Sequence, residues 1–153
     1  MNRLSKPLPD PDDQRTAPFW AGTRRHELVI QRCPVCAYLR WPPGPVCPEC
    51  LTSGGVWTTI RPTGSLWSIA EYHRAFDPAF AGDVPYTVGL IQLDDGPRMY
   101  GTMQGELGSF GPGQRVRAVF VDVAPAVTLI HWETVSEGSN QARSDMVGRC
   151  ARI

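Results

Sequence analysis

The sequence lacks three features that would point to a charged partner or to a membrane. It carries no net charge, because 15 basic and 15 acidic side chains balance, so no long-range field draws it to nucleic acid or to an anionic membrane. No apolar run approaches the roughly 18 residues that a membrane-spanning helix needs. Residues 1–13 contain three prolines and three aspartates but no apolar stretch, which is unlike a signal peptide. We therefore expect a cytoplasmic protein that does not associate with membranes.

Recognisable catalytic motifs are also absent. The chain has no Gly-x-Ser-x-Gly elbow, no phosphate-binding loop and no dinucleotide fingerprint. Its only histidines, His26, His73 and His131, lie outside any metal-binding or nucleophile motif. The adjacent Asp94 and Asp95 indicate a turn rather than a catalytic carboxylate pair. We therefore expect that the chain is not an enzyme by itself.

The most informative feature that is present is a pair of Cys-Pro-x-Cys clips. They begin at Cys33 and Cys47 and are separated by ten residues. Two Cys-x-x-Cys knuckles at this separation are typical of a zinc ribbon, in which four thiolates surround the ion and leave no position for water or substrate. The sequence therefore predicts a structural zinc site. Its ligands would be Cys33, Cys36, Cys47 and Cys50.

These cysteines have other conceivable uses besides binding zinc. Two disulfides would suit an oxidising compartment, which the absence of a signal peptide argues against. A redox dithiol usually occurs as one Cys-x-x-Cys in a strand–helix setting. Iron in a rubredoxin-like site uses the same four sulfur atoms, so iron stays open. The fifth cysteine, Cys150, lies in a polar segment, and we interpret it as an exposed thiol without a function.

The first sixty residues divide into three predicted segments. Residues 1–15 form a flexible leader, and residues 16–28 form a short helix that Thr16 caps and that runs to about Glu27. Residues 29–60 form the zinc ribbon. The apolar stripe of the helix would consist of Phe19, Trp20 and Leu28.

One detail of the ribbon departs from the usual pattern. Zinc knuckles often have glycine after the second cysteine, where the backbone is left-handed, but this chain has Ala37 and Leu51. If that geometry is kept, each residue costs on the order of 1 kcal/mol. Zinc binding supplies an apparent ~10–16 kcal/mol, which is enough to offset that cost.

From residue 61 onwards the pattern changes to β-strands. Five segments with β-forming composition predict strands, and the turn at residues 94–97 makes a hairpin of the second and third. Five strands with one hairpin suit a closed OB-fold barrel over residues 61–135. Residues 136–153 have little apolar content and predict a disordered tail. The expected fold class is therefore mainly β, with an N-terminal short helix, a rubredoxin-like zinc ribbon and a five-stranded OB-fold barrel. The predicted strands are residues 65–73, 86–93, 98–104, 115–123 and 127–133.

The order of these segments resembles a widespread bacterial and archaeal family of zinc-ribbon plus OB-fold proteins, formerly a domain of unknown function and now called acyl-CoA-associated. The resemblance spans about residues 16–132. The knuckle pair alone is generic, whereas the whole ordered series is specific. The matching residues are Phe19-Trp20, Leu28 to Cys36, Trp41-Pro42-Pro43, Cys47 to Cys50, Gly64, Pro85-Tyr86 and Gly113 to Phe120.

The resemblance implies a function in acyl-CoA metabolism, including lipid or steroid metabolism. Members of the family look like companions of thiolase-fold enzymes, namely thiolases, acyltransferases and sterol side-chain aldolases, and of some hot-dog-fold enoyl-CoA hydratases. They lack chemistry of their own, bridge the enzyme's subunits and contribute to its acyl-CoA channel. The chain is therefore expected to be a non-catalytic accessory subunit of a thiolase-like enzyme, with a hot-dog-fold hydratase as the second choice of partner.

Two sets of side chains in the helix and ribbon suit such a role. Aromatic residues in so small a region have little interior to occupy, and the stretch from residue 21 to 41 carries a local charge of +3. The arginines would grip the phosphates of a CoA thioester shared with the partner. The predicted partner-binding residues are Phe19, Trp20 and Trp41. The predicted CoA-binding residues are Arg24, Arg25, Arg32 and Arg40.

The alternative function is binding of single-stranded nucleic acid, since zinc ribbons and OB barrels both serve it. The expected binding face would use the second and third barrel strands. Residues 86–93 carry no charge, and residues 98–104 offer only Arg98 and Tyr100. A neutral chain with this face suits a protein partner better than a polyanion.

Overall fold

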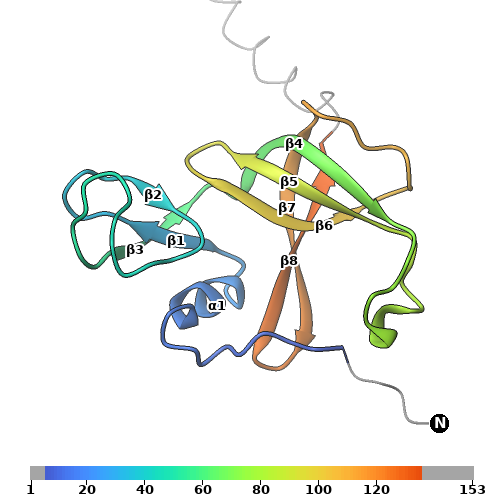
Figure 1. The fold of residues 1–153 in the computed structure, drawn as a ribbon, viewed down its shortest axis with the longest axis horizontal. Coiled ribbons are helices and arrows are strands. Elements are labelled where there is room, and N and C mark those ends of the chain that lie inside the picture. The colour runs from blue at the N-terminus through green and yellow to red at the C-terminus, as the bar shows by residue number, and fades with distance from the viewer. Residues whose placement is uncertain (1–5, 136–153) are drawn as a thin grey trace, which may run out of the picture.

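A computed structural model describes residues 6–135 of the chain (Figure 1). These residues form one short helix, a three-stranded sheet and a five-stranded barrel. The predicted tail at residues 136–153, with Cys150, and the first five residues of the predicted leader lie outside the described residues. Within residues 6–135, no helix is long and apolar enough to cross a membrane. The elements are α1 (Ala17–Thr23), β1 (Leu28–Arg32), β2 (Leu39–Arg40), β3 (Val56–Ile60), β4 (Thr63–Tyr72), the 3-10 turn η1 (Pro78–Phe80), β5 (Tyr86–Leu93), β6 (Arg98–Gln104), β7 (Arg115–Ala124) and β8 (Val127–Thr134).

The barrel has the strand order of an OB fold. It closes as β4-β5-β6-β8-β7, with β7 pairing back to β4. The β6–β8 pair is parallel and the other pairs are antiparallel. The predicted fold class is therefore confirmed, and the strand ends fall within two residues of their predicted positions. Alternation of side chains along β5, in which every second residue is buried, explains why the sequence pattern located this strand well.

The largest fully buried side chain among the described residues lies in the barrel. Trp132 on β8 is fully buried, and its indole lies directly against Gly101 of β6. A Cβ atom at residue 101 would lie 2.5 Å from the Trp132 ring, closer than such atoms approach one another. Gly101 is therefore required by this close approach rather than by a turn.

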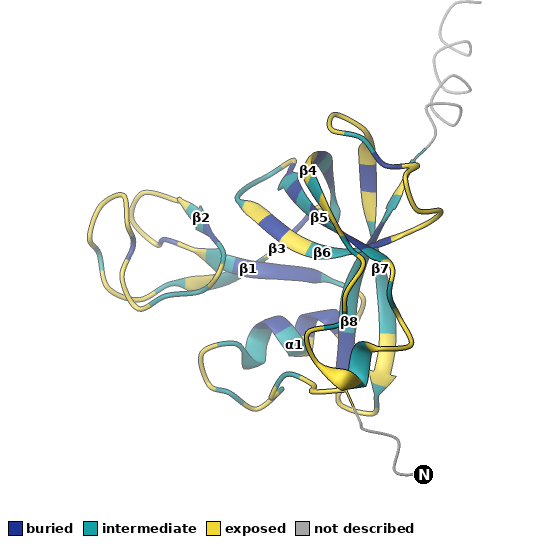
Figure 2. Ribbon diagram, turned by 45° about the vertical axis from the view of Figure 1, so that its right-hand side comes forward, coloured by how far each residue is buried: buried dark blue, intermediate teal, exposed yellow. Residues whose placement is uncertain are grey.

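Helix α1, the ribbon and the barrel share one hydrophobic core. Phe19 of α1, Ile30 of β1 and Ile60 of β3 belong to the same buried cluster as Leu66 and Ile91 of the barrel. Figure 2 shows that β1 is buried where it passes between α1 and the barrel. Because the ribbon contributes its apolar side chains to this shared core, it keeps few for an interior of its own.

The helix is shorter than the sequence predicted. It ends at Thr23 instead of about Glu27, and the Thr16 side chain forms no capping hydrogen bond. Leu28, expected on the apolar stripe of the helix, is instead the first residue of β1 and is fully buried there. The reversal occurs at His26, which has a left-handed φ of 58° and so ends the helical hydrogen bonding.

The β5–β6 hairpin joins the barrel to the ribbon. Its tip residue Gly96 lies so close to the ribbon that an added Cβ would be 3.3 Å from Leu39 of β2. Two ion pairs hold the hairpin in place, Arg61 with Asp95 at 2.6 Å and Arg115 with Asp94 at 2.7 Å. The Arg115 guanidinium contacts both oxygens of Asp94, a bidentate geometry that is stronger than a single contact.

Asp94 provides a test of this clamp. Hydrogen bonds from Arg115 lower the pKa of Asp94 to about 2, below the ordinary value of 3.8. Because the folded-state pKa is depressed, the carboxylate stabilises the fold fully above about pH 5 and loses that contribution as the pH falls toward 2. We predict that Asp94→Asn lowers the free energy of unfolding by roughly 1 kcal/mol at pH 6, after allowing for solvent screening, and that the difference from wild type disappears toward pH 2.

Urea unfolding of both proteins at each pH measures that difference. The exposed Asp12 is the matched control, and Asp12→Asn should be nearly neutral throughout. A deficit for Asp94→Asn that stays constant between pH 6 and pH 2 would contradict the role of the ionised carboxylate.

Candidate metal centre and adjoining groove

The four predicted cysteines meet at one point. All four Sγ atoms lie within 4.8 Å of one another, and the closest pairs are Cys33–Cys50 at 3.5 Å and Cys36–Cys47 at 3.6 Å. In a tetrahedral site with Zn–S bonds of ~2.3 Å, the sulfur atoms are separated by roughly 3.8 Å. The cluster therefore has the size that a tetrahedral four-thiolate zinc site requires, and a rubredoxin-type iron site uses the same donors.

The two knuckles have the same backbone geometry. In each, the residue after the second cysteine donates its amide to the carbonyl of the first, from Ala37 to Cys33 at 3.1 Å and from Leu51 to Cys47 at 2.9 Å. Ala37 has a φ of 63° and Leu51 a φ of 60°. Both positions are therefore left-handed, as the comparison with glycine-containing knuckles predicted, and both are strained for residues with a Cβ.

The local electrostatics favour thiolates at some of these sulfur atoms and oppose them at others. The hydroxyl and amide of Thr52 lower the pKa of Cys50 to about 6, and the amide of Cys36 lowers the pKa of Cys33. The amide of Tyr38 lowers the pKa of Cys36, but burial and the neighbouring cysteines outweigh it and together raise that pKa to about 12. Four thiolates so close together repel one another, and a divalent cation is the group that would let all four ionise.

The metal centre lies at one end of the ribbon. Cys33 directly follows β1, and both knuckles lie at the tip that points away from the barrel (Figure 1). Cys33 and Cys47 are buried, while Cys36 and Cys50 lie at the surface. Four protein donors leave no open position on the ion, so the ion's contribution would be to hold the ribbon together.

Removal of a ligand tests this role. We predict that wild-type protein contains about one zinc ion per chain and that Cys47→Ser abolishes stoichiometric binding and deprotects the amides of β1 and β2 in hydrogen exchange. Cys150→Ser is the matched control and should leave the zinc content unchanged. Metal analysis distinguishes zinc from iron, and a wild-type protein that folds its ribbon without either metal would overturn the assignment.

The strained knuckle positions give a second test. We predict that Ala37→Gly and Leu51→Gly each raise the free energy of unfolding by about 0.5–1 kcal/mol, because relief of left-handed strain exceeds the added entropy of the unfolded chain. Ala81→Gly is the control, since Ala81 has an ordinary φ of −59° and its replacement should destabilise slightly. Denaturant unfolding of the zinc-loaded proteins measures the three changes, and a loss of stability in both knuckle variants would contradict the strain argument.

A groove runs over the barrel beside the ribbon. Its larger hollow has a volume of about 790 Å³ and lies between η1, β5, β8 and the chain around Leu8. A smaller hollow of about 280 Å³ adjoins it where α1 and the ribbon approach β6. The two hollows share Thr102, Leu129 and His131. Most of the lining is apolar or aromatic, which is the usual character of a ligand or peptide groove.

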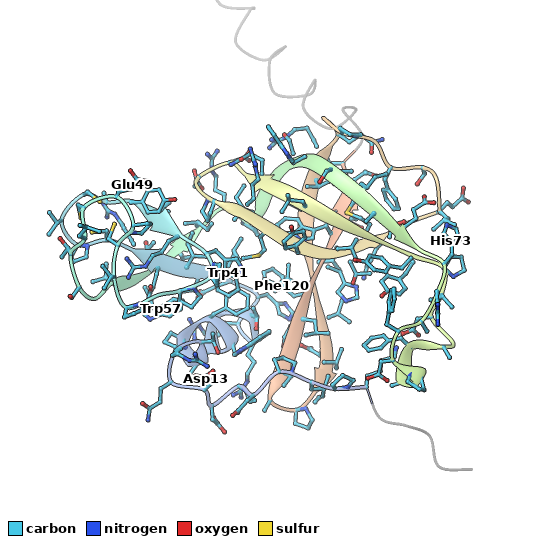
Figure 3. The ribbon with its side chains drawn as sticks, in the orientation of Figure 1. Asp13, Trp41, Glu49, Trp57, His73 and Phe120 are labelled. Atoms are coloured by element: carbon cyan, nitrogen blue, oxygen red, sulfur yellow. The ribbon has the colours of Figure 1, made fainter. Side chains whose placement is uncertain are left out.

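The three predicted partner-binding aromatics lie together at this groove. Phe19 and Trp41 have ring centroids 4.1 Å apart, and Phe19 and Trp20 are 4.8 Å apart. All three line the smaller hollow, and Figure 3 shows Trp41 at the junction of ribbon, helix and barrel. Phe19 is only 4% exposed, so little of its ring is available to a partner, and its role in partner binding stays a prediction. Its ring packs against those of Trp20 and Trp41, which are half-buried.

The four predicted CoA-binding arginines do not form one cluster. Arg24 is exposed at the end of α1 and lines a separate hollow with Asp122, and Arg25 pairs with Glu27 at 2.9 Å. Arg32 is exposed at the far end of β1, next to the metal centre.

The prediction that Arg40 binds CoA is wrong, because this residue is only 5% exposed and its side chain lies inside the ribbon. It donates to the carbonyls of Gly44 and Gly54 and to Gln31, each at 2.7 Å. Its guanidinium therefore fastens two loops of the ribbon to β1 and is unavailable to an external phosphate.

Sequence reasoning missed the polar side chains of the groove. His131 and Thr102 lie opposite each other on the parallel pair β8–β6, and burial lowers the pKa of His131. A lone histidine in a strand carries no motif, so its position in the groove depends on which strand lies beside β6. Strands β6 and β8 are distant in the sequence, so only the structure shows that they pair and that His131 therefore lies in the groove.

The fold and the cysteine cluster define a zinc-ribbon protein with an OB-fold barrel. Two protein-family models match these parts, the ChsH2 rubredoxin-like zinc ribbon domain over residues 20–54 and the ChsH2 C-terminal OB-fold domain over residues 57–121. The chain therefore belongs to the ChsH2-type family of zinc-ribbon and OB-fold proteins, the DUF35 family.

Curated relatives share part of their length with the chain. A probable enoyl-CoA hydratase alpha subunit of Thermomonospora curvata is 38% identical over 100 residues, which cover 63% of this chain and 30% of the relative. The 3-oxo-4,17-pregnadiene-20-carboxyl-CoA hydratase alpha subunit of Mycobacterium tuberculosis is 32% identical over 119 residues, which cover 77% of this chain and 37% of the relative. The chain thus spans about a third of the length of the curated relatives it matches.

Two solved structures have the same fold. A chain of the Ltp2-ChsH2(DUF35) aldolase is 29% identical, with a TM-score of 0.72, and the match covers 84% of this chain and 98% of that one. A DUF35 protein of unknown function from Sulfolobus solfataricus is 11% identical, with a TM-score of 0.56. The match covers 80% of this chain and 87% of that one. The second likeness shows the fold alone.

Proposed function

We propose that this chain is a non-catalytic accessory subunit that docks on a thiolase-superfamily enzyme and helps to form its acyl-CoA site. The observation that carries the proposal is the likeness to a chain of the Ltp2-ChsH2(DUF35) aldolase, of which 98% is covered. A thiolase, acyltransferase or aldolase is therefore the partner that we favour. The hydratase names of the curated relatives make a hot-dog-fold hydratase the second choice.

The groove supports this proposal because it suits a long, largely apolar ligand or a partner's side chains. Trp20 and Trp41 line its narrow end and His131 lies where its two hollows meet. An acyl or pantetheine chain passing from the partner would bury apolar surface against these rings, at roughly 25 cal/mol for each Å². Exposed Arg24, Arg25 and Arg32 stay the candidates for the CoA phosphates.

The pairings of the three histidines support a non-catalytic role. Among residues 6–135, Nε2 of His73 lies 3.6 Å from Oε2 of Glu71, and Nε2 of His26 lies 4.0 Å from Oδ1 of Asp122. Nδ1 of His131 contacts the side-chain amide of Gln104. None of these pairs includes a serine or cysteine that could act as a nucleophile. The chemistry would therefore come from the partner, and this chain would supply binding surface.

Coexpression tests the proposal. Each thiolase-like and hot-dog-fold enzyme of the source genome is expressed singly with the zinc-loaded chain, and stable co-elution with a thiolase-like enzyme is expected. The chain alone should turn over no acyl-CoA, whereas the complex should act on an acyl-CoA more efficiently than the enzyme alone. Absence of any complex would refute the proposal, and salt-dependent binding of the chain to an oligonucleotide would favour the nucleic-acid alternative.

A further inference from the structure

The outer face of β4, β5 and β6 carries an exposed patch that consists of Trp67, Arg98 and Tyr100, which we call the Trp67 patch. Trp67 is 53% exposed and Tyr100 is 71% exposed. Their sequence neighbours Leu66 and Met99 are buried in the barrel, so strand alternation turns the patch outward. Single exposed apolar residues are common, but large aromatic rings gathered with an arginine are typical of interaction sites.

The backbone of β4 is adapted to display Trp67. The pairing register with β5 shifts between Leu66 and Ser68, which leaves Trp67 without a partner residue on β5. Such a bulge bends the strand and redirects one side chain. The exposure of Trp67 is therefore produced by a specific feature of the strand.

Arg98 and Trp67 hold each other in a fixed arrangement. The Arg98 guanidinium lies 3.6 Å from the centroid of the Trp67 ring, which is a close cation–π contact. Arg98 also donates from Nε to the Gln92 side chain at 3.1 Å. Because these side chains are already ordered, a partner that binds them loses less conformational entropy.

Among the residues that the structure describes, Arg98 has no carboxylate partner for its charge. Within residues 6–135 Arg98 forms no ion pair, and Nε is the only guanidinium nitrogen of Arg98 that donates a hydrogen bond. Its other nitrogens are free to meet an acceptor from outside. Three other arginines of the barrel and its entry are paired, Arg61 with Asp95, Arg115 with Asp94 and Arg117 with Glu133.

We propose that the Trp67 patch is a docking site for the thiolase-like enzyme, whose facing surface presents a carboxylate to Arg98 and apolar side chains to Trp67 and Tyr100. This inference rests on the proposed function and adds a second contact region to it. Tyr100 also lines the smaller hollow beside Trp20 and Trp41. The patch therefore continues the groove, and one partner surface can cover both.

Two other occupants fit the patch less well. In a two-fold dimer of this chain the patch would face itself, and the two unpaired Arg98 guanidinium groups would repel each other. Single-stranded nucleic acid would find aromatic rings for stacking, but the patch offers one cation, on a chain with no net charge. A protein surface with one matching carboxylate is the better complement.

The test uses the full-length, zinc-loaded chain and the thiolase-like enzyme with which it co-elutes. Trp67→Ala and Tyr100→Ala should each weaken binding about 30-fold, as expected when a hot-spot residue is removed, and Arg98→Glu should weaken it at least tenfold. Phe76→Ala is the matched control, because Phe76 is an aromatic residue that is 81% exposed on another segment, and it should change the affinity less than twofold. Zinc content and circular dichroism verify that each variant is folded.

The outcomes separate the two proposals. If wild type binds no such enzyme, the proposed function fails and the docking site fails with it. If wild type binds and Trp67→Ala, Tyr100→Ala and Arg98→Glu all keep its affinity, the function stands and the docking site is refuted. Quenching of tryptophan fluorescence by a thymidine oligonucleotide that Trp67→Ala abolishes, or self-association that Arg98→Glu alters, would assign the patch to nucleic acid or to a second copy instead.

Discussion

The close approach of four cysteine sulfur atoms, all within 4.8 Å of one another, is the constraint on which the rest of the structure depends. As thiolates they would repel one another, and one bound cation would relieve that repulsion. The ribbon has only two residues in β2 and gives the side chains of Leu28, Ile30 and Ile60 to a core shared with α1 and the barrel. Among the described residues, the outer half of the ribbon therefore has little apolar interior beyond the buried Cys33 and Cys47 to hold the two knuckle loops in place. The backbone at Ala37 and Leu51 is also strained, because both residues carry a Cβ and have a left-handed φ. Coordination energy is the favourable contribution large enough to stabilise this arrangement.

The consequence reaches the groove through Trp41. This residue follows β2 directly, and its ring packs on Phe19 of α1 at 4.1 Å. The hairpin tip also contacts the ribbon, because Gly96 lies against Leu39 of β2 and Asp95 pairs with Arg61 directly after β3. The cysteine cluster, the helix and the barrel thus determine one another's positions, although the four cysteines lie at the far tip of the ribbon. A rigid surface of this kind suits the docking of another protein, because little order has to be imposed when the partner binds.

Much of the fold could be predicted because its signals are local. The cysteine spacing located the metal ligands, the alternation in residues 86–93 located β5, and the turn at residues 94–97 located the hairpin. The end of α1 could not be predicted, since a helical stripe containing Leu28 is as consistent with the sequence as a strand that begins there. Arg40 was misassigned for a related reason: its burial depends on the Gly44 and Gly54 carbonyls, which folding of the ribbon brings to it. The groove and the Trp67 patch arise from strand pairing and from a bulge, and neither leaves a signal in single-sequence composition.

The most direct test of the central claim is the affinity for the proposed enzyme partner as a function of zinc occupancy. If the ion holds the surface that docks, partner binding should fall in proportion to the zinc removed, while the amides of β7 and β8 stay protected from exchange. By linkage, the partner should also raise the apparent zinc affinity, so that a competing chelator removes less zinc at equilibrium. Undiminished binding by a zinc-free chain would contradict the account, because the docking surface would then not depend on the four thiolates.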